Sequence, residues 1–226
     1  MSVRSRARPK RAVPQARADG GRPTQADRSA RTRSALLESA ARGISRYGYG
    51  NLVLEEVARD AGYTRGALYH QFEDKEDLAM AVLAWVDETW RQEVGTRVER
   101  EQDPVAALIT LARGHAVFCR RDVARVAIAL RLEFSGRDHP VGREVKRVSE
   151  TLVKRCARLI EAGRRAGSIP PGPPARAVAL AFVGALEGAV IELAGQAPHD
   201  ELLAARAAAG VLGLDGLAAL PRGRVG

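Results

Sequence analysis

Apolar side chains recur at helical spacing in residues 54–61, where they occupy positions i, i+3, i+4 and i+7 on one face of a short helix. Gly62 follows at once and suits the left-handed backbone that ends helices. Thr64 then provides an N-cap for a second short helix, with Leu68 and Phe72 as its buried stripe. Two short helices joined by a tight glycine turn predict a helix-turn-helix, whose second helix enters the DNA major groove.

The outward face of that second helix would carry Arg65, Gly66, Tyr69 and His70, which are suited to approach base edges. Pairs of short amphipathic helices also occur in all-α proteins that never touch DNA. Spacing alone therefore leaves DNA binding and plain helix packing as open alternatives.

The rest of the chain predicts an all-α fold. Amphipathic segments predict further helices over residues 32–47, 75–90, 104–118, 122–134, 145–159, 175–193 and 200–214. The expected divisions are a disordered basic arm (1–30), a helix-turn-helix DNA-binding domain (31–78), a helical ligand-binding and dimerisation domain (79–218) and a short tail (219–226).

The net charge of +9 is unevenly distributed. Residues 1–33 hold ten Arg or Lys against two Asp, whereas residues 34–80 hold five basic against eight acidic groups. The expected DNA-binding domain thus lacks the positive charge that neutralises phosphates. We hypothesise that the arm supplies it by contacting phosphates or the minor groove; the alternative is a solvated tail without a role.

The order of residue types in the motif favours DNA binding over plain helix packing. Ala58, residues 61–64 (AGYT), 66–72 (GALYHQF) and 75–78 (KEDL) closely resemble the DNA-binding domain of the TetR family of bacterial transcriptional regulators, over about residues 32 to 80. The resemblance implies DNA contacts from Thr64, Arg65, Gly66, Ala67, Tyr69 and His70, and a phosphate contact from Lys75.

The chain departs from the family's pattern at Leu52 and Val53, where hydroxyl residues are usual. A hydroxyl there would cap the first helix of the motif and bond a phosphate. Asn51 is expected to cap this helix, and the phosphate contact is either missing or passed to Asn51.

The resemblance also implies a homodimer formed by the last two helices and a small-molecule effector held inside the body. The last two segments are rich in Ala, Leu, Val and Gly, and Gly184 and Gly188 would allow another helix to approach closely. The candidate pocket residues are large or polar groups on otherwise apolar faces: Trp85, Trp90, His115, Phe118, Arg131, Glu133, Phe134 and Cys156. Each of them is alternatively plain core or a paired charge.

Several classes of protein are not supported by the sequence. Cys119 and Cys156 are expected to be reduced and buried, the four histidines lack metal-ligand spacing, and no apolar run reaches the ~20 residues of a membrane span. No nucleophile elbow, Walker loop or dinucleotide motif is present. We therefore expect a cytoplasmic non-enzyme without a cofactor: a homodimeric regulator, acting as a repressor, that binds a palindromic operator and is released by an effector. The alternative is a helical scaffold protein that keeps the headpiece but no longer reads DNA.

Overall fold

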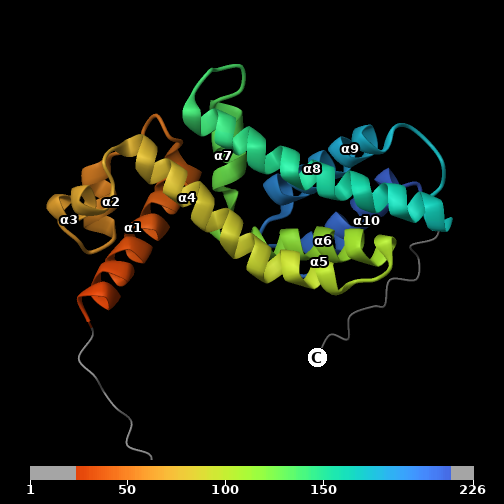
Figure 1. Cartoon of the computed structure of the whole chain (residues 1–226), viewed down its shortest axis with the longest axis horizontal. Helices are drawn as coiled ribbons and strands as arrows, with labels where there is room; N and C mark the ends of the chain where they lie inside the picture. The colour runs from red at the N-terminus through yellow and green to blue at the C-terminus, as the bar shows by residue number, and fades with distance from the viewer. Residues whose placement is uncertain (1–23, 215–226) are drawn as a thin grey trace, which may run out of the picture.

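The computed structural model describes residues 24–214, and all regular structure within that range is helical. The elements are α1 (Gln25–Tyr47), α2 (Leu54–Asp60), α3 (Arg65–Gln71), α4 (Lys75–Trp90), the π-helical turn η1 (Arg91–Gly95), α5 (Thr96–Arg100), α6 (Pro104–Phe118), the 3-10 turn η2 (Asp122–Arg125), α7 (Val126–Glu133), α8 (Pro140–Ala166), α9 (Ala175–Leu193) and α10 (His199–Val211). Figure 1 shows α1–α3 as a headpiece at one end and α5–α10 as a helical body at the other. The all-α, two-part architecture is confirmed.

Helix α1 begins at Gln25, so the prediction that the chain stays disordered to residue 30 was wrong for its last residues. A capping box starts the helix: the Thr24 hydroxyl accepts a hydrogen bond from the Asp27 amide at 3.1 Å, and the Asp27 carboxylate accepts one from the Thr24 amide at 2.9 Å. The first two turns bury no apolar side chain, so hydrophobic periodicity could not reveal them. The remainder of the expected arm (1–23) and the tail (219–226) lie outside the described residues.

The headpiece core is built where the apolar pattern predicted it. Leu36, Ala40 and Ile44 of α1 pack with Leu68 and Phe72, and all are essentially inaccessible to solvent. Tyr47, the last residue of α1, is 62% exposed.

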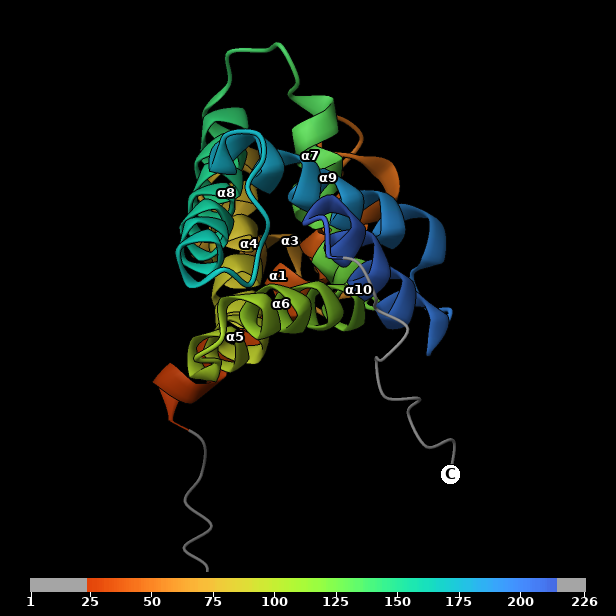
Figure 2. The same cartoon turned by 90° about the vertical axis from the view of Figure 1, so that its right-hand side faces the viewer.

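The body is entered through α4, which continues through η1 and α5 without leaving the right-handed helical conformation. Figure 2, seen at right angles to Figure 1, shows α8 and α9 on one side of the body and α6 with α10 on the other. Helix α6 contacts α8, α9 and α10, so it is the central element of the body. Within residues 24–214, no helix is both long and apolar enough to cross a membrane.

Candidate functional site

Helix α3 lies at the outer end of the headpiece (Figure 1). Its N-cap is Thr64, whose hydroxyl accepts a hydrogen bond from the Ala67 amide at 3.2 Å. Gly62 ends the preceding turn with a φ of 79°, a backbone conformation that favours glycine. Leu68 and Phe72 anchor the helix in the core. The local geometry predicted for the helix-turn-helix is therefore present.

The predicted outward face of α3 is exposed. Its exposed members are Thr64, Arg65, Gly66, Tyr69 and His70, whereas Ala67 is half-buried. The Arg65 guanidinium lies 5.3 Å from the centre of the Tyr69 ring and forms a 3.0 Å ion pair with Glu55 of α2. The Arg65 guanidinium is thus paired with the Glu55 carboxylate, which would compete with DNA for the arginine.

Replacing Glu55 by glutamine is expected to strengthen DNA binding. The substitution frees Arg65 and removes a negative charge next to α3, and exposed pairs of this kind contribute about 0.2–1 kcal/mol. We expect a rise in affinity of up to about fivefold at low salt, measured by fluorescence anisotropy with labelled DNA. Glu161→Gln removes an equal charge from an exposed position of α8 and serves as the control. Equal affinities of the two variants would show that the Glu55–Arg65 pair does not restrain binding.

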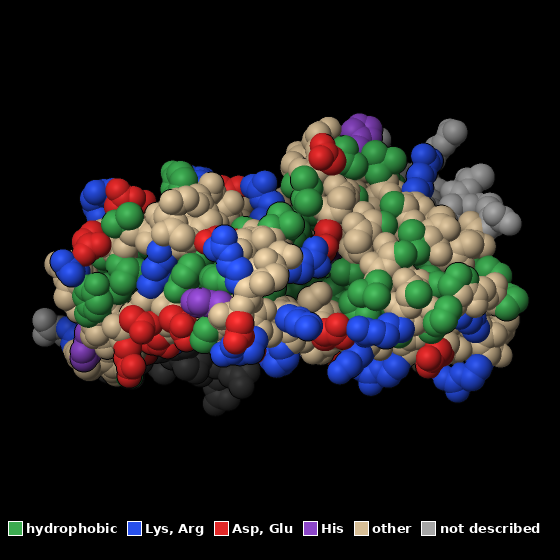
Figure 3. Space-filling model, turned by 90° about the horizontal axis from the view of Figure 1, so that it is seen from above, with side chains coloured by type: hydrophobic (Ala, Val, Ile, Leu, Met, Phe, Trp, Pro, Cys, Tyr) green, Lys and Arg blue, Asp and Glu red, His purple; other side chains and the backbone are tan. Residues whose placement is uncertain are grey.

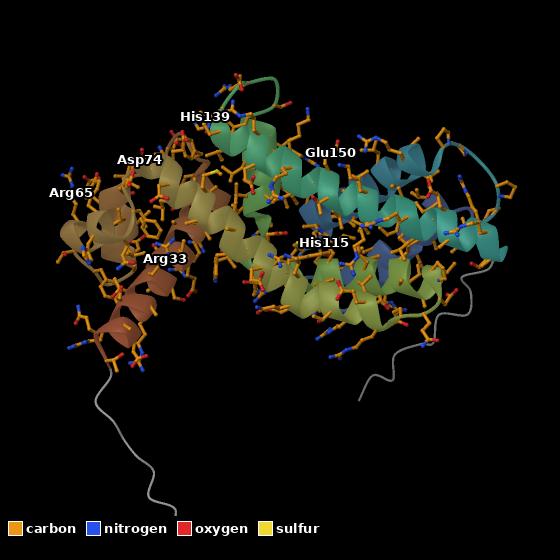
Figure 4. The ribbon with its side chains drawn as sticks, in the orientation of Figure 1. Arg33, Arg65, Asp74, His115, His139 and Glu150 are labelled. Atoms are coloured by element: carbon orange, nitrogen blue, oxygen red, sulfur yellow. The ribbon has the colours of Figure 1, made fainter. Side chains whose placement is uncertain are left out.

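The early turns of α1 hold the C-terminal end of α3. The Arg33 guanidinium donates to the Gln71 carbonyl at 3.1 Å and lies 4.5 Å from the centre of the Phe72 ring (Figure 4). The Gln71 amide nitrogen donates to the Ser29 hydroxyl at 3.0 Å. Ser29 was missed because the helix was predicted to begin at residue 32. Arg33 lies inside that predicted helix, but its contact with α3 could not be read from helical spacing. The Thr24 and Asp27 capping pair was the signal that would have revealed the earlier start of the helix.

Lys75, expected at a phosphate, is engaged within the headpiece. Its ammonium group donates to the Gly50 carbonyl at 2.9 Å and lies 4.8 Å from the centre of the Tyr49 ring. Burial lowers the pKa of this lysine. The side chain therefore joins the start of α4 to the turn between α1 and α2, and its contact with DNA stays a prediction.

Asn51 does not cap α2, which corrects the expectation from sequence. Its side-chain amide donates to the Tyr47 carbonyl at 2.9 Å, and the N-cap of α2 is Val53, which makes no side-chain capping bond. Leu52 is buried at 6% exposure, where it packs closely against Gly43. The departure from the family's hydroxyl residues thus places an apolar side chain in the headpiece core.

The body contains a cavity of about 360 Å³ between α4, α6, α7 and α8. Three predicted pocket residues, Trp90, His115 and Phe118, line it. The other lining residues are Leu83, Val86, Asp87, Arg91, Ala124, Ala127, Arg147, Val148, Thr151, Leu152 and Arg155. Figure 4 shows His115 in this part of the body, well separated from Arg65 on the headpiece.

The polar groups deep in this cavity are uncharged. The Trp90 indole N–H donates to His115 Nδ1 at 3.2 Å, so the proton of the neutral ring resides on Nε2. Burial lowers the pKa of His115 to about 4, which keeps the ring neutral at physiological pH. The Cys119 sulfur lies 3.7 Å from His115 Nε2, and burial raises the pKa of its thiol to about 12. Within residues 24–214, no cluster of His, Cys, Asp and Glu is suited to hold a metal ion.

Five predicted pocket residues do not line the cavity. Trp85 packs half-buried against the core, and Cys156 is fully buried, which raises the pKa of its thiol to about 12. Arg131 forms an ion pair with Glu187 of α9. Sequence spacing placed these side chains on the inner faces of helices, but it could not tell a packed face from one that borders a cavity.

Glu133 and Phe134, the last two, connect the body to the headpiece instead. The Glu133 carboxylate accepts hydrogen bonds from the Tyr49 and Gly50 amides, both at 2.6 Å, and the Tyr49 ring lies 5.2 Å from the Phe134 ring. Gly48 has a φ of 80°, and a side chain there would meet the Glu133 carboxylate at 2.9 Å. Glycine is required at that position for both reasons.

A second contact between the two parts is the ion pair of Arg46 in α1 with Asp122 in η2, at 2.6 Å. The arginine holds the pKa of the Asp122 carboxyl below its usual value. Since Ala124 and Ala127 of the same segment line the cavity, a wall of the cavity is in direct contact with the headpiece.

Comparison with known proteins places the headpiece in a family. The family model described as "Bacterial regulatory proteins, tetR family" matches residues 36–82. The chain is 30% identical to the A-factor receptor protein of Streptomyces griseus over 147 residues, which is 64% of this chain but about half, 48%, of that protein. It is 29% identical to the HTH-type transcriptional repressor BepR of Brucella suis biovar 1 over 69% of this chain and 78% of BepR.

Solved structures share the fold. AibR in complex with isovaleryl coenzyme A and operator DNA superposes with a TM-score of 0.68 at 21% identity, over 79% of this chain and 97% of that one. The fatty acid degradation regulator FadR from Bacillus halodurans superposes with a TM-score of 0.66 at 17% identity, over 80% of this chain and 94% of that one. The likeness therefore extends from the headpiece through most of the body.

Proposed function

Because this chain belongs to the TetR family of bacterial regulatory proteins, we propose that it is a homodimeric transcriptional repressor that binds a palindromic operator and is released by a small-molecule effector. The observation that carries the proposal is the exposed face of α3, where Arg65, Tyr69 and His70 stand free of the headpiece core. A cytoplasmic location follows from this function.

Helix α3 is suited to read base edges. The N-terminal turn holds the exposed Thr64 and Gly66, so the backbone can approach the groove closely, and Tyr69 is 43% exposed on the same face. The anchoring of α3 by Leu68, and of its last residue by Arg33, keeps this face in one orientation. Rigid presentation of a short helix is what major-groove recognition requires.

The apolar outer face of α9 and α10 supports dimerisation. Leu180 and Ile191 of α9 are 49% and 55% exposed, and Leu203 of α10 is 41% exposed. Gly184 and Gly188 lie between the two α9 residues, and a side-chain carbon at either glycine would meet nothing within 4 Å. Such a face is a poor monomer surface and suits a two-fold bundle in which each chain gives two helices.

The effector would act through the cavity in the body. Its walls include Leu83 of α4 and Ala127 of α7, and both helices contact the headpiece. A ligand that moves either helix changes the separation of the two α3 helices in a dimer. Because half-sites lie one helical turn, ~34 Å, apart, a small change prevents both from being read together.

The relatives favour this reading over the scaffold alternative. BepR is named a transcriptional repressor, and the A-factor receptor protein is named for the molecule it receives. A scaffold that had lost DNA binding would have no need to keep the exposed α3 face.

The test is a binding assay on the DNA upstream of the protein's own gene. We expect salt-dependent, specific binding to a palindrome, and Tyr69→Ala should weaken it by about 1–3 kcal/mol, roughly 5- to 150-fold. Tyr47→Ala is the matched control, because Tyr47 is an exposed tyrosine at the far end of α1. Absence of specific binding to neighbouring intergenic DNA, or equal affinity of both variants, would contradict the proposal.

A further inference from the structure

The cavity in the body joins a charged rim to an apolar interior. Its exposed lining residues, Arg91, Arg147 and Thr151, mark the opening between α4 and α8. Its buried lining residues are apolar: Leu83, Val86, Phe118 and Ala124. A ligand with one polar end and one hydrocarbon end matches this arrangement.

The charge at the opening is positive. Arg91, Arg147 and Arg155 line the cavity against one carboxylate, Asp87, which gives the lining a net charge of +2. Helix α8, which forms one side of the opening, carries eight Lys or Arg residues against three Glu, a net charge of +5. Figure 3 shows Lys and Arg side chains in a row along one edge of the body. Such a field attracts anions toward the opening.

All three arginines also contact a carboxylate outside the cavity lining, and for Arg155 this is Glu99. Arg91 pairs with Glu88 at 2.6 Å and Arg147 with Glu144 at 2.6 Å, and both arginine side chains are more than half exposed. Exposed ion pairs contribute little, so an incoming anion can replace or share these partners at small cost.

Arg155 is the best placed of the three to bind an anion. Its side chain is 23% exposed, and its Nη2 donates to the Gly95 carbonyl at 3.2 Å and lies 3.3 Å from the Glu99 carboxylate. Its Nε and Nη1 make no hydrogen bond to any residue in the described range. The bond to the π-helical turn η1 therefore orients the guanidinium while two nitrogens remain available.

The interior excludes a charged group. His115 is neutral, Trp90 already donates to it, and the carboxylate and guanidinium groups of the lining belong to α4, η1 and α8. The volume of about 360 Å³ is at the small end of the range for ligand pockets, ~300–1,000 Å³.

From these features we propose that the effector is a small amphipathic carboxylate. Its anionic group binds Arg155, with Arg91 and Arg147 beside it, and its hydrocarbon portion contacts Phe118 and Leu83. The inference rests on the proposed function for its regulatory meaning, since it names the class of molecule that would release the repressor from DNA.

Direct binding to the full-length chain tests the ligand class. Octanoate, octan-1-ol and octylamine share a chain length and differ in charge, and binding is followed by titration calorimetry. We expect octanoate to bind at least about tenfold more tightly than the alcohol or the amine, since hydrogen bonds to charged groups contribute about 1.5–3 kcal/mol. Equal or tighter binding of the alcohol or the amine, or no binding by any of the three, overturns the proposal.

Variants then test the assigned residues. Arg155→Gln should weaken octanoate binding about tenfold or more, whereas Arg158→Gln, an exposed arginine of α8 that does not line the cavity, should leave it unchanged. Arg147→Gln, at the exposed rim, keeps the test decisive if Arg155→Gln folds poorly, and should weaken binding about threefold. Unchanged octanoate affinity in both rim variants overturns the assignment. The calorimetry needs no DNA, so octanoate binding without release of the operator would contradict the effector step of the proposed function and leave the assignment of the carboxylate site standing.

Discussion

Replacing Gly188 by arginine is expected to convert the protein to a monomer and to abolish tight operator binding. A side-chain carbon at Gly188 meets no atom of the same chain within 4 Å, so the folded monomer accommodates the change. In a two-fold bundle the added side chain appears twice where two α9 helices approach. Overpacking costs about 1–3 kcal/mol at each copy, which raises the dimer dissociation constant by roughly 30-fold or more.

Analytical ultracentrifugation measures the association, and circular dichroism at 222 nm checks that the helices are retained. Ala166→Arg, at an exposed residue at the end of α8, adds the same side chain away from the proposed interface and should remain dimeric. Should Gly188→Arg remain a dimer with full operator affinity, α9 does not form the interface.

Replacing Arg120 by alanine is expected to destabilise the body strongly. Arg120 of α6 forms two 2.8 Å hydrogen bonds to Asp200 of α10, a carboxylate that is only 2% exposed. Removing the arginine leaves that buried charge without its partner. We expect a loss of about 3 kcal/mol in the free energy of unfolding, the lower end of the usual range because Arg120 itself is partly exposed.

The neighbouring residue supplies the control. Arg121 pairs with Glu93 at 2.8 Å with both side chains largely exposed, so Arg121→Ala should cost under about 1 kcal/mol. Urea unfolding at one protein concentration compares the two, because the proposed dimerisation would make stability depend on concentration. Equal losses in the free energy of unfolding in the two variants would show that the burial of Asp200 does not increase the contribution of the Arg120 ion pair.

The same pair predicts how stability depends on pH. Hydrogen bonds from Arg120 hold the pKa of the Asp200 carboxyl below its ordinary value. A lowered pKa in the folded state means that the contribution is present above the pKa of the unfolded chain and is lost as pH falls through the lowered value. The difference in stability between the wild-type chain and Asp200→Asn should therefore shrink in acid.

The sequence was most informative where local rules of helix period, capping and turn formation decide the structure. The paired short helices, the Thr64 cap and the buried Leu68 and Phe72 followed from period, glycine and capping rules. The start of α1 escaped because its first turns bury nothing apolar. The first turns of α1 are stabilised by capping bonds and by the hydrogen bond from Arg33 to Gln71 of α3, which lies 38 positions further along the chain.

The cavity was predicted less completely, for a physical reason. Trp90, His115 and Phe118 border the cavity. Cys156 lies on the same face of α8 as the cavity residue Leu152, yet it is fully buried in the core. A cavity arises from how several helices fail to fill the space between them, which no single helix encodes. Glu133 reads as an isolated charge on an apolar helix until the turn at Tyr49 is placed against it.

Helix α7 is eight residues long, about 12 Å, with Ala127 bordering the cavity and Glu133 holding the turn after α1. Under the proposed function, effector sensing and DNA reading would therefore meet at this helix of about two turns. Val148 and Leu152 border the cavity from α8, which contacts α4, α6, α7 and α9. Exchanging those α8 side chains would retune which molecule is detected and leave the promoter choice intact. The proposed function would in this respect make the chain a modular starting point for building new biosensors.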